Sequence, residues 1–156
     1  MLGNVVFTNE WGNTITFNAD GGVYPITSWD YEIQQRFEPE PRSAYDGTWA
    51  TYDYDGGMQI SFEGAILASS SSDYTTKRND LATAFRDRPS PRLRRTGILV
   101  VDFTGTTENV KADVSLMSIS IPRNGAGNAY SEFRIELFSN LPYWVGVTSS
   151  DVYFDI

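Results

Sequence analysis

The chain has 156 residues, a length that fits one domain whose core is large enough to fold without a metal or crosslinks. It contains no Cys and no His, which excludes thiolate chemistry, disulfide frameworks, zinc fingers and imidazole catalysis. Its net charge of −8 argues against a nucleic-acid-binding protein, whose phosphate contacts need a surplus of Lys and Arg. We therefore expect one domain over residues 1–156, with no cofactor, no metal and no enzymatic activity.

The charge is divided unevenly along the chain. Residues 1–63 contain ten acidic and two basic residues, whereas residues 64–95 contain seven basic and three acidic ones. The remaining residues have a net charge of −4. No apolar run approaches the roughly 18 residues of a membrane-spanning helix, and residues 1–20 lack the pattern of a secretory signal. The sequence predicts a protein that does not contact a membrane.

The first half of the chain is dominated by period-two alternation of apolar and polar residues, the pattern of half-buried β-strands. A Gly pair at Gly21-Gly22 is typical of a turn, and Asp55-Gly56 predicts a hairpin turn. The strands expected in this half cover residues 4–7, 14–17, 28–37 and 58–63.

One segment departs from this alternation. Between residues 73 and 86, the apolar side chains of Tyr74, Leu81 and Phe85 recur at helical spacing. Ser72 or Asp73 is the expected N-cap, and Pro89 lies just beyond the expected end. The sequence predicts one amphipathic α-helix over about residues 73–86.

Strand patterns return after this helix. Residues 97–103 are almost continuously apolar, which predicts a central strand covered on both faces. In residues 112–121 the alternation slips by one residue between Leu116 and Met117, as a β-bulge would cause. Further strands are expected at 132–137 and 152–156, with a turn at 125–128. The predicted fold is mainly β, with one helix.

Several residue groups could carry chemistry, and each has a plain structural alternative. Residues 51–56 resemble a calcium loop, but the first Asp and the closing Glu are missing. Acid pairs such as Asp53 with Asp55 could serve a glycosidase, although an acidic chain contains many such pairs on solvated strands. Trp49, Tyr52 and Tyr54 lie among these carboxylates and could bind a sugar; aromatics are equally common in strands and protein interfaces.

Five of the twelve basic residues are arginines that lie within ten positions. They are Arg86, Arg88, Arg92, Arg94 and Arg95. A solvated loop and a nucleic-acid-binding arm are two interpretations of this segment. A third is a contact with carboxylates of a neighbouring copy, because the guanidinium group matches a carboxylate in bidentate geometry. Asp46, Asp53 and Asp55 are candidate partners in such a head-to-tail contact, which can close into a ring.

The order of these elements resembles the N-terminal domain of the distal tail proteins of long-tailed siphophages (Dit). The resemblance covers about residues 23–144 and is carried by two segments. The first, at 56–85, is GGMQISFEGAILASSSSDYTTKRNDLATAF; the second, at 97–114, is GILVVDFTGTTENVKADV. The resemblance implies a β-sandwich flanked by one helix and related to the tail-tube fold.

The same resemblance implies a structural virion protein made in the host cytoplasm. It implies a homo-hexameric ring that joins the tail tube protein to a tail-tip or baseplate hub protein, with DNA passing the lumen without specific binding. It supplies no catalytic residues, and the second carbohydrate-binding domain of many relatives is not expected in this chain. Two alternatives remain: a β-sandwich carbohydrate-binding module that uses the three aromatics named above, and a tail-tube or tail-terminator subunit.

Overall fold

The computed structural model describes residues 2–36, 40–41, 48–49, 54–86, 96–104, 106–122, 130–149 and 151–153. For the strand and helix ends at 35–36, 40–41, 48–49, 54–55 and 86, it describes the backbone only. No helix of these ranges is long and apolar enough to cross a membrane.

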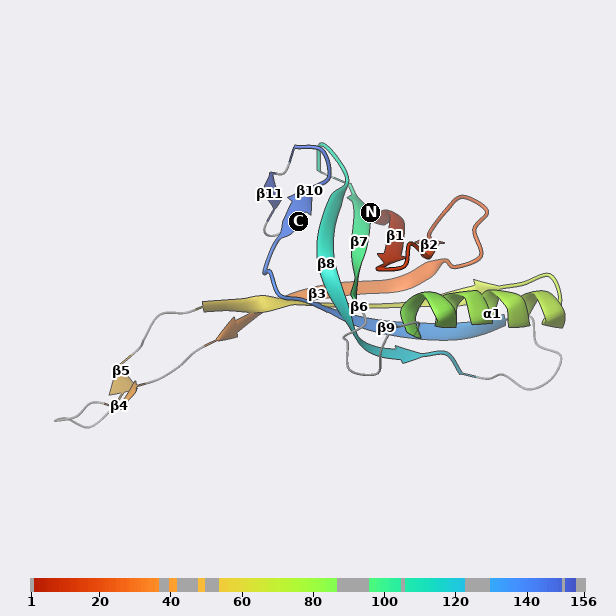
Figure 1. Ribbon diagram of the computed structural model, residues 1–156, viewed down its shortest axis with the longest axis horizontal. Coiled ribbons are helices and arrows are strands. Elements are labelled where there is room, and N and C mark those ends of the chain that lie inside the picture. The colour runs from red at the N-terminus through yellow and green to blue at the C-terminus, as the bar shows by residue number, and fades with distance from the viewer. Residues whose placement is uncertain are drawn as a thin grey trace.

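The fold is mainly β, antiparallel, with one helix, as predicted (Figure 1). The strands of its large sheet follow the order β2-β1-β7-β8-β9-β6-β3. Their bounds are β1 Leu2–Asn9, β2 Thr14–Phe17, β3 Ile26–Arg36, β6 Tyr54–Leu67, β7 Thr96–Phe103, β8 Val110–Ser120 and β9 Tyr130–Ser139. Two short strands, β10 Trp144–Gly146 and β11 Val152–Tyr153, join the start of β8. A separate two-stranded ribbon pairs β4 Glu40–Pro41 with β5 Thr48–Trp49.

The large sheet folds over on itself at β8. The first half of β8 pairs with β7, and its second half pairs with β9. The register shifts between Leu116 and Ser118, which confirms the predicted bulge, and the extra residue, Met117, is exposed. Figure 1 shows β8 curving from the layer of β2, β1 and β7 into the layer of β9, β6 and β3. The sheet thus forms both layers of a sandwich.

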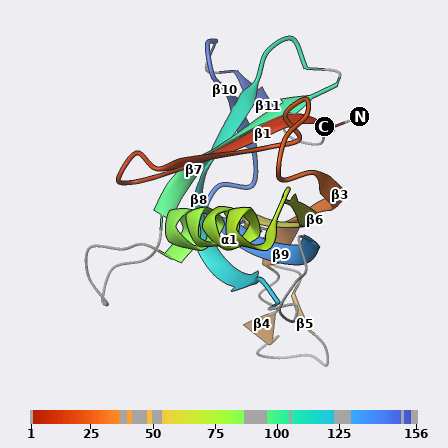
Figure 2. The ribbon, with the colours of Figure 1, turned by 90° about the vertical axis from the view of Figure 1, so that its right-hand side faces the viewer.

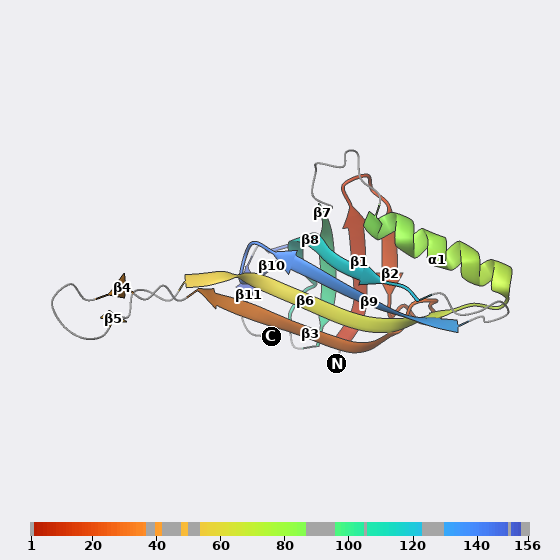
Figure 3. The ribbon, with the colours of Figure 1, turned by 90° about the horizontal axis from the view of Figure 1, so that it is seen from below.

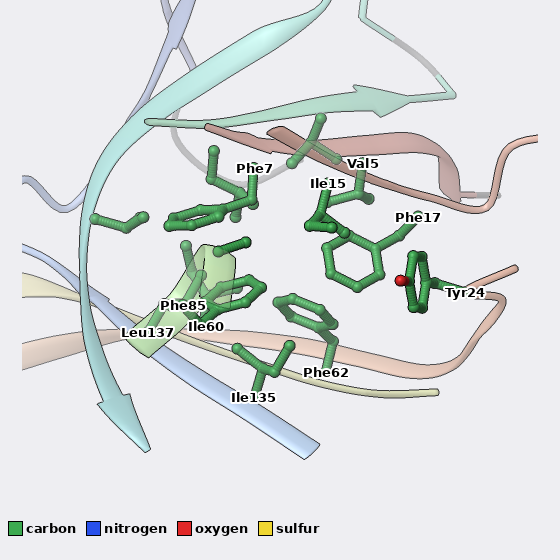
Figure 4. Packing of buried hydrophobic residues seen from close by; sticks show 14 of the residues in the cluster. Val5, Phe7, Ile15, Phe17, Tyr24, Ile60, Phe62, Phe85, Ile135 and Leu137 are labelled. Atoms are coloured by element: carbon green, nitrogen blue, oxygen red, sulfur yellow. The ribbon is translucent and has the colours of Figure 1, made fainter. Parts of the chain in front are cut away.

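Apolar side chains of the two layers meet in one core (Figure 4). Phe17 of β2 contacts Phe62 of β6 with ring centroids 5.2 Å apart, and Phe133 of β9 with centroids 5.6 Å apart. All three rings are almost fully buried. Burying a side chain of this size contributes about 1.5–3 kcal/mol, so these rings are a main source of the adhesion between layers.

The helix α1, Ser71–Arg86, lies beside the gap between the two layers (Figure 2). It contacts β1, β2 and β6. Its N-cap is Ser70, whose hydroxyl accepts a hydrogen bond from the backbone N–H of Asp73 at 3.2 Å, so the expectation of Ser72 or Asp73 was wrong by two or three residues. Asp73 instead stabilises the first turn, where its carboxylate accepts a bond from the backbone N–H of Ser69.

Hydrogen bonds from the end of β1 and from the loop between β2 and β3 hold the helix in place. The hydroxyl of Tyr24 donates to the carbonyl of Lys77 at 2.8 Å, and the amide of Asn9 donates to the carbonyl of Ala84 at 3.1 Å. Burial, with the nearby charges of Asp80 and Asp73, raises the pKa of Tyr24 to about 12. The Tyr24 hydroxyl therefore remains a donor across the physiological pH range.

Two further local predictions were wrong. Residues 97–103 do form a strand between two others, but β7 alternates buried and accessible residues, and the Ile98 side chain is 44% exposed. Asp55-Gly56 lies within β6, where Gln34 of β3 faces both Gly56 and Gly57. This arrangement is a bulge rather than a turn, and Gly57 supplies its positive φ of 116°.

Other strand predictions hold within the described residues. The turn at Gly21-Gly22 is present, with the N–H of Gly22 donating to the carbonyl of Ala19 at 2.7 Å. The predicted terminal strand pairs with β10 at residues 152–153, so it completes the sheet of its own protomer. The turn predicted at 125–128 lies outside the described residues.

Candidate interaction surfaces

All of the predicted site residues lie where the structure describes no side chains. Arg86 ends α1, Trp49 lies in β5, and Tyr54 and Asp55 begin β6, each described by its backbone alone. Outside the described residues lie Asp46, Tyr52, Asp53, Arg88, Arg92, Arg94 and Arg95. Their proposed contacts therefore remain predictions.

A different charged surface is well defined, on the outer face of the layer formed by β3, β6, β9 and the second half of β8. Figure 3 shows β3, β6 and β9 side by side in this layer. The side chains that point away from the core carry five carboxylates and one guanidinium, a formal charge of −4. We call this surface the acidic sheet face; it consists of Asp30, Glu32, Glu63, Glu132, Arg134 and Glu136.

Strand register explains why these residues meet. Glu63 of β6 lies opposite Arg134 of β9, and the next outward pair is Ser61 with Glu136. On the other side of β6, Asp30 of β3 lies opposite Ser61. Because alternate residues of a strand share a face, the polar halves of three strands form one surface. Sequence alternation placed Glu63 and Glu136 on polar faces, but only the strand order makes them neighbours.

Arg134 partly neutralises the centre of the acidic sheet face. Its guanidinium contacts the carboxylates of Glu63 at 3.2 Å and Glu136 at 3.0 Å. The hydroxyl of Ser118 in β8 donates to Glu136 at 2.9 Å. Arg134 and Glu63 are more than half exposed, so these ion pairs add little stability, and most of the negative charge of the face remains available to solvent.

Two features of the described residues bear on the requirements of a metal site and of a ligand groove. Among them, no group of three or more carboxylates is arranged to hold a metal ion. An open groove with a volume of about 540 Å³ lies on the opposite layer, over β1, β7 and β8. Its charged lining residues are Glu10 and Asp113.

Comparison with solved structures bears on the fold. The structure is similar to the Dit protein of phage SPP1, described as a paradigm of the hub adsorption apparatus in phages that infect Gram-positive bacteria. The TM-score is 0.62 at 6% identity, over 91% of this chain and 52% of that chain. The chain has the fold of a phage baseplate hub protein. The Dit resemblance inferred from sequence is thereby confirmed at the level of fold.

Two structures of the phage P2 baseplate in its activated conformation give the same result. The one with calcium has a TM-score of 0.61 at 12% identity, and the one with strontium has 0.61 at 13% identity. Each match covers 92% of this chain and 45% of the other, so this chain spans about half the length of these hub-fold proteins. No protein-family model and no curated protein matches the sequence.

Proposed function

We propose that this chain is a structural protein of a phage tail, and that it forms a hexameric ring joining the tail tube to the tail tip or baseplate hub. The observation that carries this proposal is the similarity of nearly the whole chain to the Dit hub protein of phage SPP1. The lack of Cys and His supports a role without catalysis. In this proposal the partners are sister copies, a tail tube protein and a hub protein.

The acidic sheet face supports a position beside the DNA path. A channel that conducts duplex DNA must not bind phosphates, since a basic surface would gain affinity by releasing counterions. The acidic sheet face has a charge of −4 per copy and no Lys among its described side chains. In our proposal this face lines the lumen, and the layer of β1, β2 and β7 lies on its outer side with α1.

The uneven charge distribution supports a head-to-tail ring. Residues 64–95 have a net charge of +4, and residues 1–63 have a net charge of −8. We retain the contact of the arginines at 86, 88, 92, 94 and 95 with Asp46, Asp53 and Asp55 of a neighbouring copy as part of this proposal. Such a heterologous contact uses two different surfaces of each copy. The series of copies closes into a ring when the rotation between neighbouring copies is a whole-number fraction of a full turn.

Two measurements test whether the protein forms a ring and where that ring lies in the phage tail. Native mass spectrometry of the purified protein, alone and with the tube and hub proteins, should show a six-fold species. Immunogold electron microscopy should label virions at one position at the distal end of the tail. A strictly monomeric protein that binds neither partner contradicts the ring. Labels repeated along the tail indicate a tube subunit, and a label at the head-proximal end indicates a terminator.

A further inference from the structure

A groove with a volume of about 500 Å³ lies between strand β2 and the helix α1. Its wall on the sheet side is formed by Thr14, Ile15 and Thr16 of β2, and its described lining includes no residue of β1. The groove therefore follows the edge of β2 that faces away from β1. Figure 3 shows α1 beside β2 at this end of the sheet.

The backbone of β2 presents free hydrogen-bonding groups to this groove. Among the described strands, β2 pairs only with β1. Asn9 donates its backbone N–H to the carbonyl of Asn13 at 3.0 Å, so the hairpin starts on a bonded pair. Opposite pairs of an antiparallel ladder alternate between bonded and non-bonded. Thr14 and Thr16 consequently occupy non-bonded positions, and their backbone N–H and C=O groups point away from β1.

The next outward residue of the chain agrees with this direction. Asn18, two positions after Thr16, donates its outward N–H to the carbonyl of Tyr24 at 3.1 Å. In the part of the chain that the structure describes, Thr14 and Thr16 have no such backbone partner on this side. Unpaired N–H and C=O groups on a strand edge favour the addition of another extended chain.

The opposite wall of the groove is one face of α1, formed by Lys77, Asp80, Thr83 and Ala84. Lys77 is already paired with Asp73, with its Nζ 2.7 Å from the carboxylate. Asp80 is exposed and has no ion pair with any residue that the structure describes. The uncompensated charge in the groove is therefore negative, and it favours an occupant with a Lys or Arg side chain.

The size and charge of the groove indicate a short segment of a different protein. Its volume lies in the range of small-ligand sites, so it can hold a few residues of extended chain rather than a folded domain. The edge strand at the other end of the large sheet, β3, carries Asp30 and Glu32. If β3 of a second copy entered the groove, these acids would repel Asp80.

We propose that the groove between β2 and α1 binds an extended, basic segment of another tail protein, which adds to β2 as a further strand. In this arrangement the backbone groups of Thr14 and Thr16 pair with the segment, and its Lys or Arg side chain lies against Asp80. This inference rests on the proposed function, because that function supplies the class of partner, a tail tube or hub protein.

Amide hydrogen exchange, followed by NMR on the native protein, tests the free edge. Without a partner, the N–H groups of Thr14 and Thr16 should exchange fast, and those of Ile15 and Phe17 slowly, because only the latter two bond to β1. The probes are short overlapping peptides that cover the tube and hub proteins of the same phage. A basic peptide from one of them should slow exchange at Thr14 and Thr16.

Substitutions separate backbone pairing from side-chain contacts. Thr16→Pro removes an outward N–H, a change that edge strands tolerate, and it should weaken peptide binding about tenfold. Thr16→Val keeps the N–H and nearly the same shape, so it should bind as the native protein does. Asp80→Asn should weaken binding about threefold at low salt and less at high salt. Asp113→Asn, outside this groove, is its control and should have no effect.

The outcomes distinguish this inference from the proposed function. A six-fold distal ring in which no tube or hub peptide slows exchange at Thr14 and Thr16 overturns the inference and leaves the function standing. A peptide that slows exchange at both residues while the protein stays monomeric supports the groove and contradicts the ring. Slow exchange at both residues in the assembled protein without peptide shows that a second copy fills the groove, which also overturns the inference.

The substitutions have their own contradicting results. Equal losses of binding in Thr16→Val and Thr16→Pro show a contact with the hydroxyl and contradict strand addition. If Thr16→Pro does not fold, as judged by circular dichroism, the exchange measurement on the native protein decides. A peptide that binds without slowing exchange at Thr14 or Thr16 occupies another surface and counts against the groove.

Discussion

The ring of Phe85 near the end of α1 stacks on the ring of Phe7 in β1, with centroids 4.1 Å apart and planes 12° from parallel. Both side chains are buried, and the same Phe85 ring approaches Phe17 of β2 at 6.3 Å. This contact attaches the helix to the strand layer that is farther from the acidic sheet face.

Replacing Phe85 with Ala should therefore release the end of α1. Truncation of a fully buried Phe leaves a cavity and typically costs about 3–5 kcal/mol of the free energy of unfolding. Urea unfolding followed by Trp fluorescence measures the loss. Ala82→Gly, in the same helix at a half-buried position, should cost only about 1 kcal/mol. Equal losses in the two variants would mean that the stacking contributes little.

Gly57 should be much less tolerant of Ala than another glycine with positive φ. Its φ is 116°, and an added Cβ would lie 2.6 Å from the carbonyl oxygen of Ser139, so Gly57→Ala combines backbone strain of about 1–3 kcal/mol with a steric clash. Gly21, at φ 67°, has no atom within 4 Å of such a Cβ. Thermal unfolding should show a clearly larger fall in Tm for Gly57→Ala than for Gly21→Ala. A similar fall in both variants would contradict the close approach of β6 and β9 at this bulge.

Glu108 should make the free energy of unfolding depend on pH in the acid range. Its carboxylate accepts hydrogen bonds from the Ser149 hydroxyl and the backbone N–H groups of Thr148 and Ser149, which lower the pKa of Glu108 below its ordinary value. Because the folded-state pKa is below the unfolded one, the stabilisation is complete above the unfolded pKa and is lost as the pH falls through the folded pKa.

Glu108→Gln should remove this part of the acid dependence and lower stability at neutral pH. Urea midpoints measured from pH 7 down to pH 3 would show the difference as a flatter profile than that of the native chain. Glu132→Gln, on the acidic sheet face, removes one carboxylate elsewhere in the protein and is the matched control. If both variants change the profile equally, the bonds to Glu108 are not its cause.

Reversing the charge of the acidic sheet face should make the ring hold DNA. Replacing Glu63, Glu132 and Glu136 with Lys changes the formal charge of this face from −4 to +2 per copy. After sizing confirms that the variant assembles, duplex DNA should bind at low salt, and the binding should weaken steeply as salt rises. A control with Lys at Thr75, Asn79 and Thr83, on the exposed side of α1, should bind less. Equal binding by the control would contradict the placement of the face in the lumen.

Neutralising arginines of residues 86–95 should weaken assembly, because it removes charge that the proposed contact between copies uses. The triple change Arg92→Gln, Arg94→Gln and Arg95→Gln should shift native-mass or sizing profiles toward monomer, more at low salt than at high salt, because salt already screens these contacts in the native protein. Lys77→Gln with Lys111→Gln removes basic charge elsewhere and should have a smaller effect. A salt-independent loss of assembly would indicate lost packing rather than lost charge.

Much of the fold could be predicted from local patterns. Alternation in residues 132–137 and helical spacing between Tyr74 and Phe85 correspond to β9 and α1, because period two and period 3.6 each direct apolar side chains to one face. The slip at Leu116 located the bulge in β8. Asp55-Gly56 misled because a turn and a bulge both favour a glycine with positive φ, and here the next residue, Gly57, has that conformation within a bulge of β6.

The sequence alone determined which side chains are apolar, where the helix and most of the long strands form, and that this chain has neither the thiol nor the imidazole chemistry of many enzymes. Only the tertiary structure decided that Glu63, Arg134 and Asp30 share one face and that β8 belongs to both layers of the sandwich. The reason is physical. Local periodicity fixes the face on which a side chain lies, whereas strand order depends on long-range pairing among residues up to a hundred positions apart.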